Sequence, residues 1–215
     1  MKEILKQTKF NLYIIGLTII TWIIALPFLP TSIPMQYSAN GEVNWSANRF
    51  VACIVMITIM IFCYVVTNLK IFKDKEQNKF SNMASLNDLL NTSAQGIMYV
   101  ISLIIIFNGL GYNISANFVV PVLIGLLLII IGNYLPKIPK NNTLGIKNKW
   151  TKASEFVWKK THRFTAIVYI VVGLLMFIFG LLNIITSAIT ITLVVILILV
   201  PFLYSWYTYQ NTVKN

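Results

Sequence analysis

The chain has 215 residues, of which 57% are apolar and only 11% are charged. That charged share is less than half of the share in an ordinary soluble domain, and the mean hydropathy is +0.76. A helix that crosses a bilayer needs about 20 apolar residues, so six such helices need roughly 120, close to what this composition supplies. The composition excludes a soluble globular enzyme, a disordered chain and a disulfide scaffold. The formal net charge of +11 comes from 17 Lys and Arg against 6 Asp and Glu.

Six apolar runs follow one another along the chain, and none of them contains Asp, Glu, Lys or Arg. They cover residues 10–29, 50–69, 93–111, 118–135, 164–182 and 188–207. The first run is too long for the apolar part of a signal peptide, and prolines follow it instead of a small-residue cleavage site. The runs predict an all-α integral membrane protein with six transmembrane helices.

The basic residues are distributed unevenly between the segments that join these runs. The N-terminus holds 3 Lys or Arg, residues 70–92 hold 4, residues 136–163 hold 8 and the C-terminal tail holds 1, whereas residues 30–49 hold only 1. Cytoplasmic segments of membrane proteins are enriched in Lys and Arg, so both termini are predicted to lie in the cytoplasm of a multi-pass cell-membrane protein. This topology accounts for the net charge without nucleic-acid binding.

The predicted spans group into three parts. Residues 1–69 form two spans with an outer loop, residues 70–92 form a cytoplasmic linker, and residues 93–215 form a four-span part whose basic inner loop covers residues 136–163. The polar residues inside the predicted spans are uncharged, and all six acidic residues lie outside them. Because charged groups inside a membrane usually serve a function there, their absence argues against proton coupling.

The outer loop predicts a short hairpin. Pro30 and Pro34 keep its start extended, and Asn40-Gly41 is a strong hairpin-turn signal. One apolar face is predicted from four alternating residues, namely Met35, Tyr37, Val43 and Trp45. The hairpin is interpreted either as a lid over helix ends or as a surface that meets an extracellular ligand.

The inner loop predicts one amphipathic helix that begins at Trp150, with Thr151 as N-cap and Glu155 in the first turn. Its apolar side would carry Trp150, Ala153, Val157 and Trp158, and its polar side Lys152, Glu155, Lys159 and Arg163. The helix either lies at the membrane interface or leads directly into the span. The basic residues would contact anionic lipid, and the tryptophans would anchor the interface.

Groups for enzyme chemistry are scarce. His162 is the single histidine, and the sequence has no paired carboxylates, Cys/His dyad, metal-ligand spacing or phosphate-binding loop. Cys53 and Cys63 are about 15 Å apart along one helix, which is too far for a disulfide. We therefore expect no catalysis, no metal and no cofactor. His162 is predicted to be a neutral hydrogen-bonding residue, because neighbouring Lys and Arg disfavour its charged form.

Two segments carry a family resemblance. The segment 132–164 resembles the SdpI-type immunity protein family of Gram-positive bacteria. The resemblance rests on Asn133, Pro136-Lys137, Asn142, Leu144-Gly145-Ile146, Trp150-Thr151, Trp158 and Thr161-His162-Arg163. Pro34, Gly41 and Arg49 resemble the small extracytoplasmic module often found ahead of the SdpI-like part. That module usually has His and Asp where this chain has Gln36 and Asn44, so a charged pair is not expected there.

The resemblance implies protection of a cell against a secreted, membrane-active peptide toxin. It also implies a receptor that captures a cytoplasmic transcriptional autorepressor at the membrane. The alternative is a transporter or lipid-handling protein that exports toxin or alters the bilayer. Candidate partner-binding residues in the inner loop are Asn133, Pro136, Lys137, Asn142, Gly145, Trp150, Thr151, Trp158, His162 and Arg163. Outer-loop candidates are Pro34, Tyr37, Gly41, Trp45 and Arg49.

Overall fold

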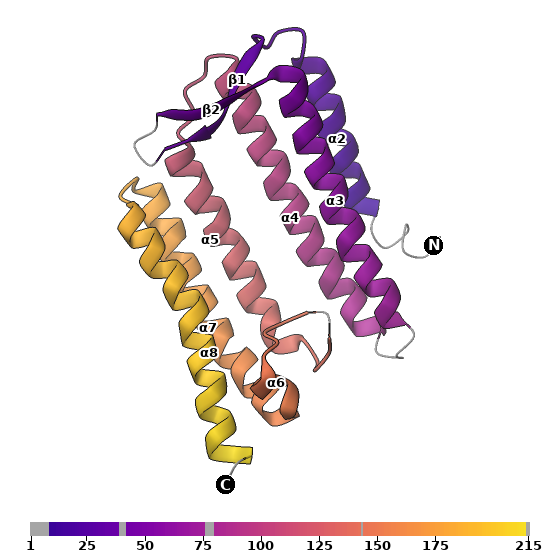
Figure 1. Cartoon of the computed structure of the whole chain (residues 1–215), viewed down its shortest axis with the longest axis vertical. Coiled ribbons are helices and arrows are strands. Elements are labelled where there is room, and N and C mark those ends of the chain that lie inside the picture. Colours follow the sequence, from indigo (N-terminus) through magenta and orange to yellow (C-terminus); the bar gives the residue numbers. More distant parts are fainter. Residues whose placement is uncertain (1–8, 39–41, 76–79, 143, 214–215) are drawn as a thin grey trace. The chain divides into compact units, whose positions relative to one another are not determined.

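The computed structural model describes residues 9–38, 42–75, 80–142 and 144–213, most of which are helical. The chain forms two compact units, residues 1–120 and residues 121–215. In the first unit, α2 covers Lys9–Ala25, α3 covers Arg49–Lys75 and α4 covers Phe80–Gly109. These helices lie side by side, and a hairpin of β1 (Ser32–Tyr37) and β2 (Val43–Asn48) crosses one end of them (Figure 1).

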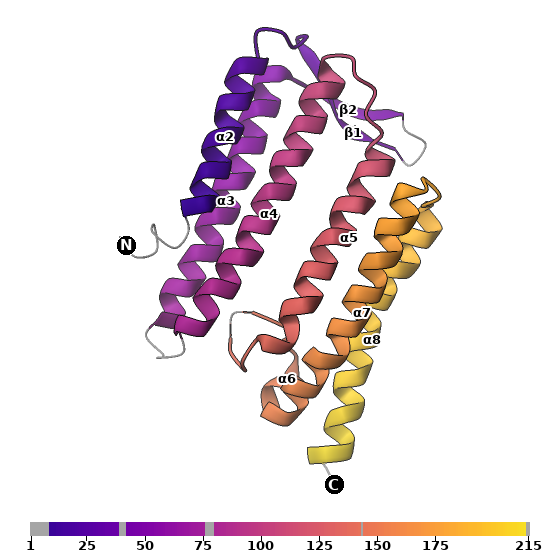
Figure 2. The ribbon, with the colours of Figure 1, turned by 180° about the vertical axis from the view of Figure 1, so that it is seen from behind.

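The second unit is a set of long helices with an irregular segment at one end. α5 covers Ala116–Tyr134 and begins just before the unit boundary, and the short helix η1 covers Leu135–Lys137. α6 covers Lys149–Ala153, α7 covers Glu155–Leu181 and α8 covers Ser187–Val213. Figure 2 shows α7 and α8 side by side, with α6 next to the start of α7.

Among the described residues, five helices are long and apolar enough to cross a membrane. They cover residues 49–68, 87–109, 118–137, 155–181 and 187–212. The remaining predicted span, the first along the chain, corresponds to α2, an apolar helix of 17 residues that falls just below that length. Large apolar side chains stay exposed along these helices, including Ile54, Ile167 and Ile198 at 63%, 63% and 64%. Exposed apolar surface on this scale fits contact with lipid, so the structure supports a multi-pass, mainly helical membrane protein.

The helix of the third predicted span starts earlier than the sequence predicts. α4 begins at Phe80, and the part of it that is long and apolar enough to cross a membrane covers Asn87–Gly109 and so includes Asp88. The sequence predicts that Asp88 lies in a linker, whereas the structure places it within α4. Helix propensity continues without a Gly or Pro through residues 80–92, which hydropathy alone assigned to a linker.

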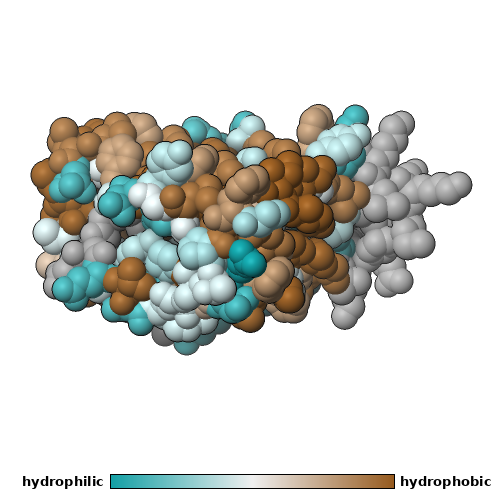
Figure 3. Space-filling view, turned by 90° about the horizontal axis from the view of Figure 1, so that it is seen from above, coloured by the Kyte–Doolittle hydropathy of each residue, from teal (hydrophilic) through white to brown (hydrophobic). Residues whose placement is uncertain are grey.

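The predicted hairpin is confirmed, but its buried face is not the predicted one. Ile33 pairs with Ala47, and both are buried against the helix ends, whereas Val43 and Trp45 are about half exposed. A bulge between Pro34 and Tyr37 shifts the register, so the alternation does not continue along the hairpin. Seen from this end, hydrophilic and hydrophobic residues intermingle on the surface (Figure 3).

Two glycines allow α5 and α7 to approach closely. A Cβ on Gly125 would lie 2.6 Å from the carbonyl oxygen of Gly173, and a Cβ on Gly173 would lie 2.7 Å from that of Gly125. Between helices in lipid, close packing of small residues replaces the hydrophobic effect as the source of association. The core beside this crossing contains Leu128, Val172 and Met176.

The predicted single inner helix is two helices. Ser154 has an extended backbone, with φ −138° and ψ 136°, and separates α6 from α7. The N-cap of α6 is Asn148, not Thr151, and Thr151 is the N3 residue of the resulting capping box. Ala153, placed on the apolar face by the periodicity, is exposed, because the extended Ser154 interrupts the helical periodicity between α6 and α7.

Candidate functional site

Trp158 anchors the start of α7 to the segment that leaves η1. Its side chain is fully buried, and its indole Nε1 donates to the carbonyl oxygen of Ile138 at 2.9 Å. A buried indole N–H needs such a partner, because an unpaired buried donor costs about 1–3 kcal/mol. Trp158 therefore holds the segment after η1 against α7 through a buried hydrogen bond and does not anchor the helix at the membrane interface.

His162 lies one turn further along α7 and is also fully buried. Its Nδ1 lies 2.8 Å from the carbonyl oxygen of Trp158, and its Nε2 accepts from the backbone N–H of Ile146 at 3.1 Å. A carbonyl can only accept and a backbone N–H can only donate. The imidazole is therefore neutral, with its proton on Nδ1, which agrees with the prediction of a hydrogen-bonding histidine.

Gly145 lets the loop pass directly over these two rings. Its φ is +101°, a conformation that favours glycine. A Cβ at this position would collide with His162 Nε2 and lie 3.2 Å from Trp158 Cζ2. Both the backbone conformation and the available space therefore require glycine here.

Asn148 and Thr151 tie the same loop to α6 and α8. The Asn148 side chain accepts from the backbone N–H groups of Trp150 and Thr151, and its Nδ2 donates to Ser205 Oγ on α8 at 2.7 Å. The Thr151 hydroxyl donates to the carbonyl oxygen of Ile146 at 2.8 Å. This carbonyl and the N–H bonded to His162 belong to the same residue, so α6 and α7 hold the loop at one point.

We call this arrangement the His162 cluster. Its members share buried or half-buried positions and hydrogen bonds or ring contacts with one another, and they are Gly145, Ile146, Asn148, Thr151, Trp158 and His162. Four of them were predicted from the sequence. Ile146 was noted only within the family motif, and Asn148 was missed although Asn is among the residues preferred at a helix N-cap.

The remaining predicted inner-loop residues lie outside this cluster. Trp150 is half-buried and packs edge-on against Phe202 of α8, with ring centroids 4.8 Å apart. The other five are all exposed, and they are Asn133, Pro136, Lys137, Asn142 and Arg163. Asn133 donates to the Ile129 carbonyl of its own helix. The structure therefore separates the motif into a buried core and an exposed surface.

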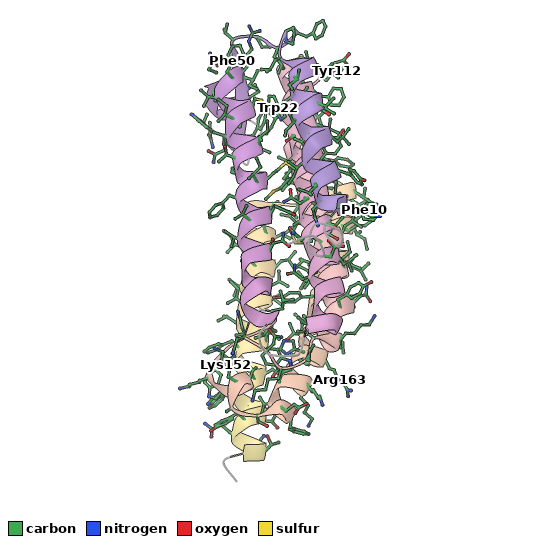
Figure 4. The ribbon with its side chains drawn as sticks, turned by 90° about the vertical axis from the view of Figure 1, so that its right-hand side faces the viewer. Phe10, Trp22, Phe50, Tyr112, Lys152 and Arg163 are labelled. Carbon is green, nitrogen blue, oxygen red and sulfur yellow. The ribbon has the colours of Figure 1, made fainter. Side chains whose placement is uncertain are left out.

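The exposed surface is strongly basic. Lys149, Lys152, Lys159, Lys160 and Arg163 are all exposed on α6 and the first turns of α7. Figure 4 shows Lys152 and Arg163 at this same end of the second unit. Lys159 pairs with Glu155 at 2.8 Å, but both side chains are more than half exposed, and such a pair contributes little to stability. This surface suits an anionic lipid headgroup or an acidic protein surface.

Among the outer-loop candidates, Arg49 has the best-defined role. Its guanidinium donates through Nη1 to the carbonyl oxygen of Leu29. Its backbone N–H donates to the carbonyl oxygen of Thr31 at 3.1 Å. Arg49 thus joins the start of α3 to the chain that leaves α2. Pro34 and Tyr37 are half-buried and Trp45 is exposed, while Gly41 lies outside the described residues.

Beside the hairpin, an open apolar pocket of about 490 Å³ lies between α2 and the chain after α4. It is lined by Thr21, Ile24, Ala25, Phe28, Leu110 and Tyr112. Within the described ranges, no group of three His, Cys, Asp or Glu is placed to hold a metal ion. Both Cys53 and Cys63 are free thiols.

Comparison with known proteins gives matches to both halves of the chain. Residues 137–205 match the SdpI/YfhL protein family, and residues 13–61 match a domain of unknown function, DUF1648. Over 204 residues the chain is 28% identical to the immunity protein SdpI of Bacillus subtilis strain 168, covering 94% of this chain and 93% of that protein. The resemblance to the SdpI family is confirmed. The SdpI match begins in η1 and ends at Ser205, the residue that Asn148 contacts. No solved structure matches the chain.

Proposed function

We propose that this chain is a membrane-embedded immunity protein that protects its cell against a secreted, membrane-active peptide toxin. The observation that carries the proposal is the relationship to the SdpI immunity protein along almost the entire chain. The family-matched segment also contains the His162 cluster, whose side chains hydrogen-bond to backbone groups of the adjoining loop and present no catalytic group to a substrate. That arrangement suits a binding protein better than an enzyme.

The basic surface of α6 and α7 supports a second part of the proposal, docking of a cytoplasmic transcriptional repressor. The buried cluster would fix the surface rigidly, and the exposed Lys and Arg side chains would make the contacts. Long-range attraction of an acidic partner by such a patch raises the rate of encounter. The toxin would be met at the other end, by the hairpin or between spans.

The proposed topology has six spans with both termini in the cytoplasm, α2 being the first span. A helix of 17 residues is at the lower limit for crossing a bilayer. Reporter tags after residue 215 and near Ser38 should give signals from opposite compartments, with the C-terminal tag inside. An outside signal at the C-terminus would overturn this topology.

The direct test of function is expression of the chain in a toxin-sensitive strain, followed by challenge with candidate secreted toxins. Survival should rise with the chain and not with an empty vector or with a truncation lacking residues 187–215. Survival should also persist after the proton gradient is collapsed, since binding needs no ion flow. Loss of survival on collapse, at unchanged protein level, would favour export instead, for which Asp88 inside α4 is the relevant observation.

A further inference from the structure

The interior of the three-helix unit changes character along its length. Toward the hairpin it is apolar, with Trp22, Ala52, Met56 and Ile105 among its buried side chains. Toward the opposite end it contains five polar side chains that are each no more than 6% exposed, namely Asn11, Asn68, Asn87, Asn91 and Gln95. We call these five residues the polar seam. In Figure 4, Trp22 lies toward the hairpin end of α2 and Phe10, the neighbour of Asn11, lies toward the other end.

The seam faces inward from all three helices. Asn87, Asn91 and Gln95 are spaced by four residues and so share one face of α4. At one end, Asn11 of α2 donates to the Asp88 carboxylate at 2.9 Å. At the other end, Gln95 donates to the carbonyl oxygen of Met60 on α3 at 3.0 Å. Eight residues of helix, or about 12 Å, separate Asn87 from Gln95.

Each seam residue has one buried polar atom without a hydrogen-bond partner in the described part of the chain. The atoms are Asn11 Oδ1, Asn68 Oδ1, Asn87 Nδ2, Asn91 Nδ2 and Gln95 Oε1. The amides of Asn11, Asn68 and Gln95 each donate through nitrogen to a carboxylate or carbonyl, so their free atoms must be acceptors. The seam therefore leaves three acceptors and two donors unpaired. In lipid, each unpaired group costs several kcal/mol.

The mixture of donors and acceptors decides which ligand fits. A cation would bind the three oxygens and the neighbouring Asp88 carboxylate but would leave the two N–H groups unpaired, and an anion would bind only those two N–H groups. Water both donates and accepts, and buried waters typically make about three hydrogen bonds to otherwise unpaired groups. We propose that the polar seam is a hydration site, in which a column of ordered water molecules bridges the five amides from Asp88 to Gln95 inside the membrane-spanning part of the bundle.

The proposal can be tested by water-edited solid-state NMR of the full chain in lipid bilayers, with glutamine and tryptophan labelled with ¹⁵N. Gln95→Leu identifies the Gln95 signal. Gln36 is exposed and gives the wet reference, and the Trp158 indole is buried and bonded to protein, giving the dry one. Water magnetisation should reach the Gln95 amide as early as Gln36 and several-fold earlier than Trp158. Transfer as slow as that to Trp158 would overturn the proposal.

Thermal unfolding gives an independent test with Asn91→Leu. In a hydrated seam this change removes a water ligand and leaves the other amides unpaired, so the Tm should fall. In a dry seam it removes an unpaired donor, and the Tm should rise, which would contradict the proposal. Thr58→Leu, on the exposed face of α3, is the control, because it replaces a polar side chain by leucine outside the seam and shows how much that change alone alters the Tm. Exchange of sodium and potassium for choline should leave the Gln95 signal unmoved, and a shift would identify a cation in place of water.

Discussion

The imidazole of His162 stacks on the indole of Trp158, with ring centroids 4.2 Å apart and planes inclined by 21°. Each ring also makes a hydrogen bond to a different part of the loop that precedes α6: Trp158 to the Ile138 carbonyl and His162 to the Ile146 N–H. The loop is therefore held at two points eight residues apart by one turn of α7. This pairing makes the shape of the basic surface depend on side chains that are buried beneath it.

Substitution of His162 should separate hydrogen bonding from imidazole chemistry. His162→Gln keeps a donor and an acceptor and should retain most protection. His162→Ala leaves the Ile146 N–H unpaired, which costs about 1–3 kcal/mol, and should lower protection or the amount of folded protein. Both are measured as survival on toxin challenge and as folded protein in the membrane. Complete loss with both variants at normal protein levels would require the imidazole itself.

The tautomer of His162 is a second expected outcome that needs no toxin. The chain has one histidine, so ¹⁵N-histidine labelling gives a single pair of ring signals. The contacts to the Trp158 carbonyl and the Ile146 N–H predict a protonated Nδ1 and an unprotonated Nε2 at neutral pH. A protonated Nε2 would contradict the arrangement, because two donors would then face each other.

The sequence reveals much of this site but not how it is held together. Trp158, His162 and Gly145 are identified by motif spacing, whereas two of their partners are the Ile138 carbonyl and the Ile146 N–H. Every residue has such backbone groups, so no sequence pattern selects these two. The bond from Asn148 to Ser205 joins residues that are 57 positions apart, and no local signal connects them.

Helix boundaries show a similar division. The apolar runs locate every long helix, because lipid requires about 20 apolar residues wherever a chain crosses it. They do not locate ends that continue as polar helix, which is how Asp88 came to be assigned to a linker instead of α4. Likewise, Ser154 takes an extended backbone and separates two helices. No Gly or Pro marks this break in the sequence, so the sequence did not predict it.

Removing the Trp158 donor should be costly. Trp158→Phe keeps most of the buried aromatic volume but leaves the Ile138 carbonyl unpaired, with an expected loss of about 1–3 kcal/mol. The matched control is Trp206→Phe on α8, where the tryptophan is 45% exposed. Unfolding of the purified protein in detergent measures both changes. Similar effects at the two positions would mean that the Trp158 hydrogen bond does not stabilise the loop.

Close packing of α5 on α7 predicts opposite results for alanine at two glycines in helices. Gly125→Ala would place its Cβ 2.6 Å from the Gly173 carbonyl oxygen and 2.7 Å from the Phe177 nitrogen, so backbone must move and the Tm should fall. Gly96→Ala, on α4, meets no atom within 4 Å and should raise stability by about 0.5–1 kcal/mol through helix propensity. Equal changes in stability for Gly125→Ala and Gly96→Ala would show that α5 and α7 do not cross closely at Gly125 and Gly173.

Gly145 and Gly111 share a positive φ but differ in their surroundings. Gly145 has φ +101° and faces His162 and Trp158, whereas Gly111 has φ +94° and no atom within 4 Å of a built Cβ. Alanine at either position should cost about 1–2 kcal/mol for the backbone conformation alone. Gly145→Ala should cost clearly more, because its Cβ also displaces the imidazole and breaks the bond from the Ile146 N–H. The excess should largely disappear when His162→Ala is combined with Gly145→Ala, since the colliding ring is then gone. An undiminished excess in the double variant would place the cost in the backbone of the loop and not in its contact with His162.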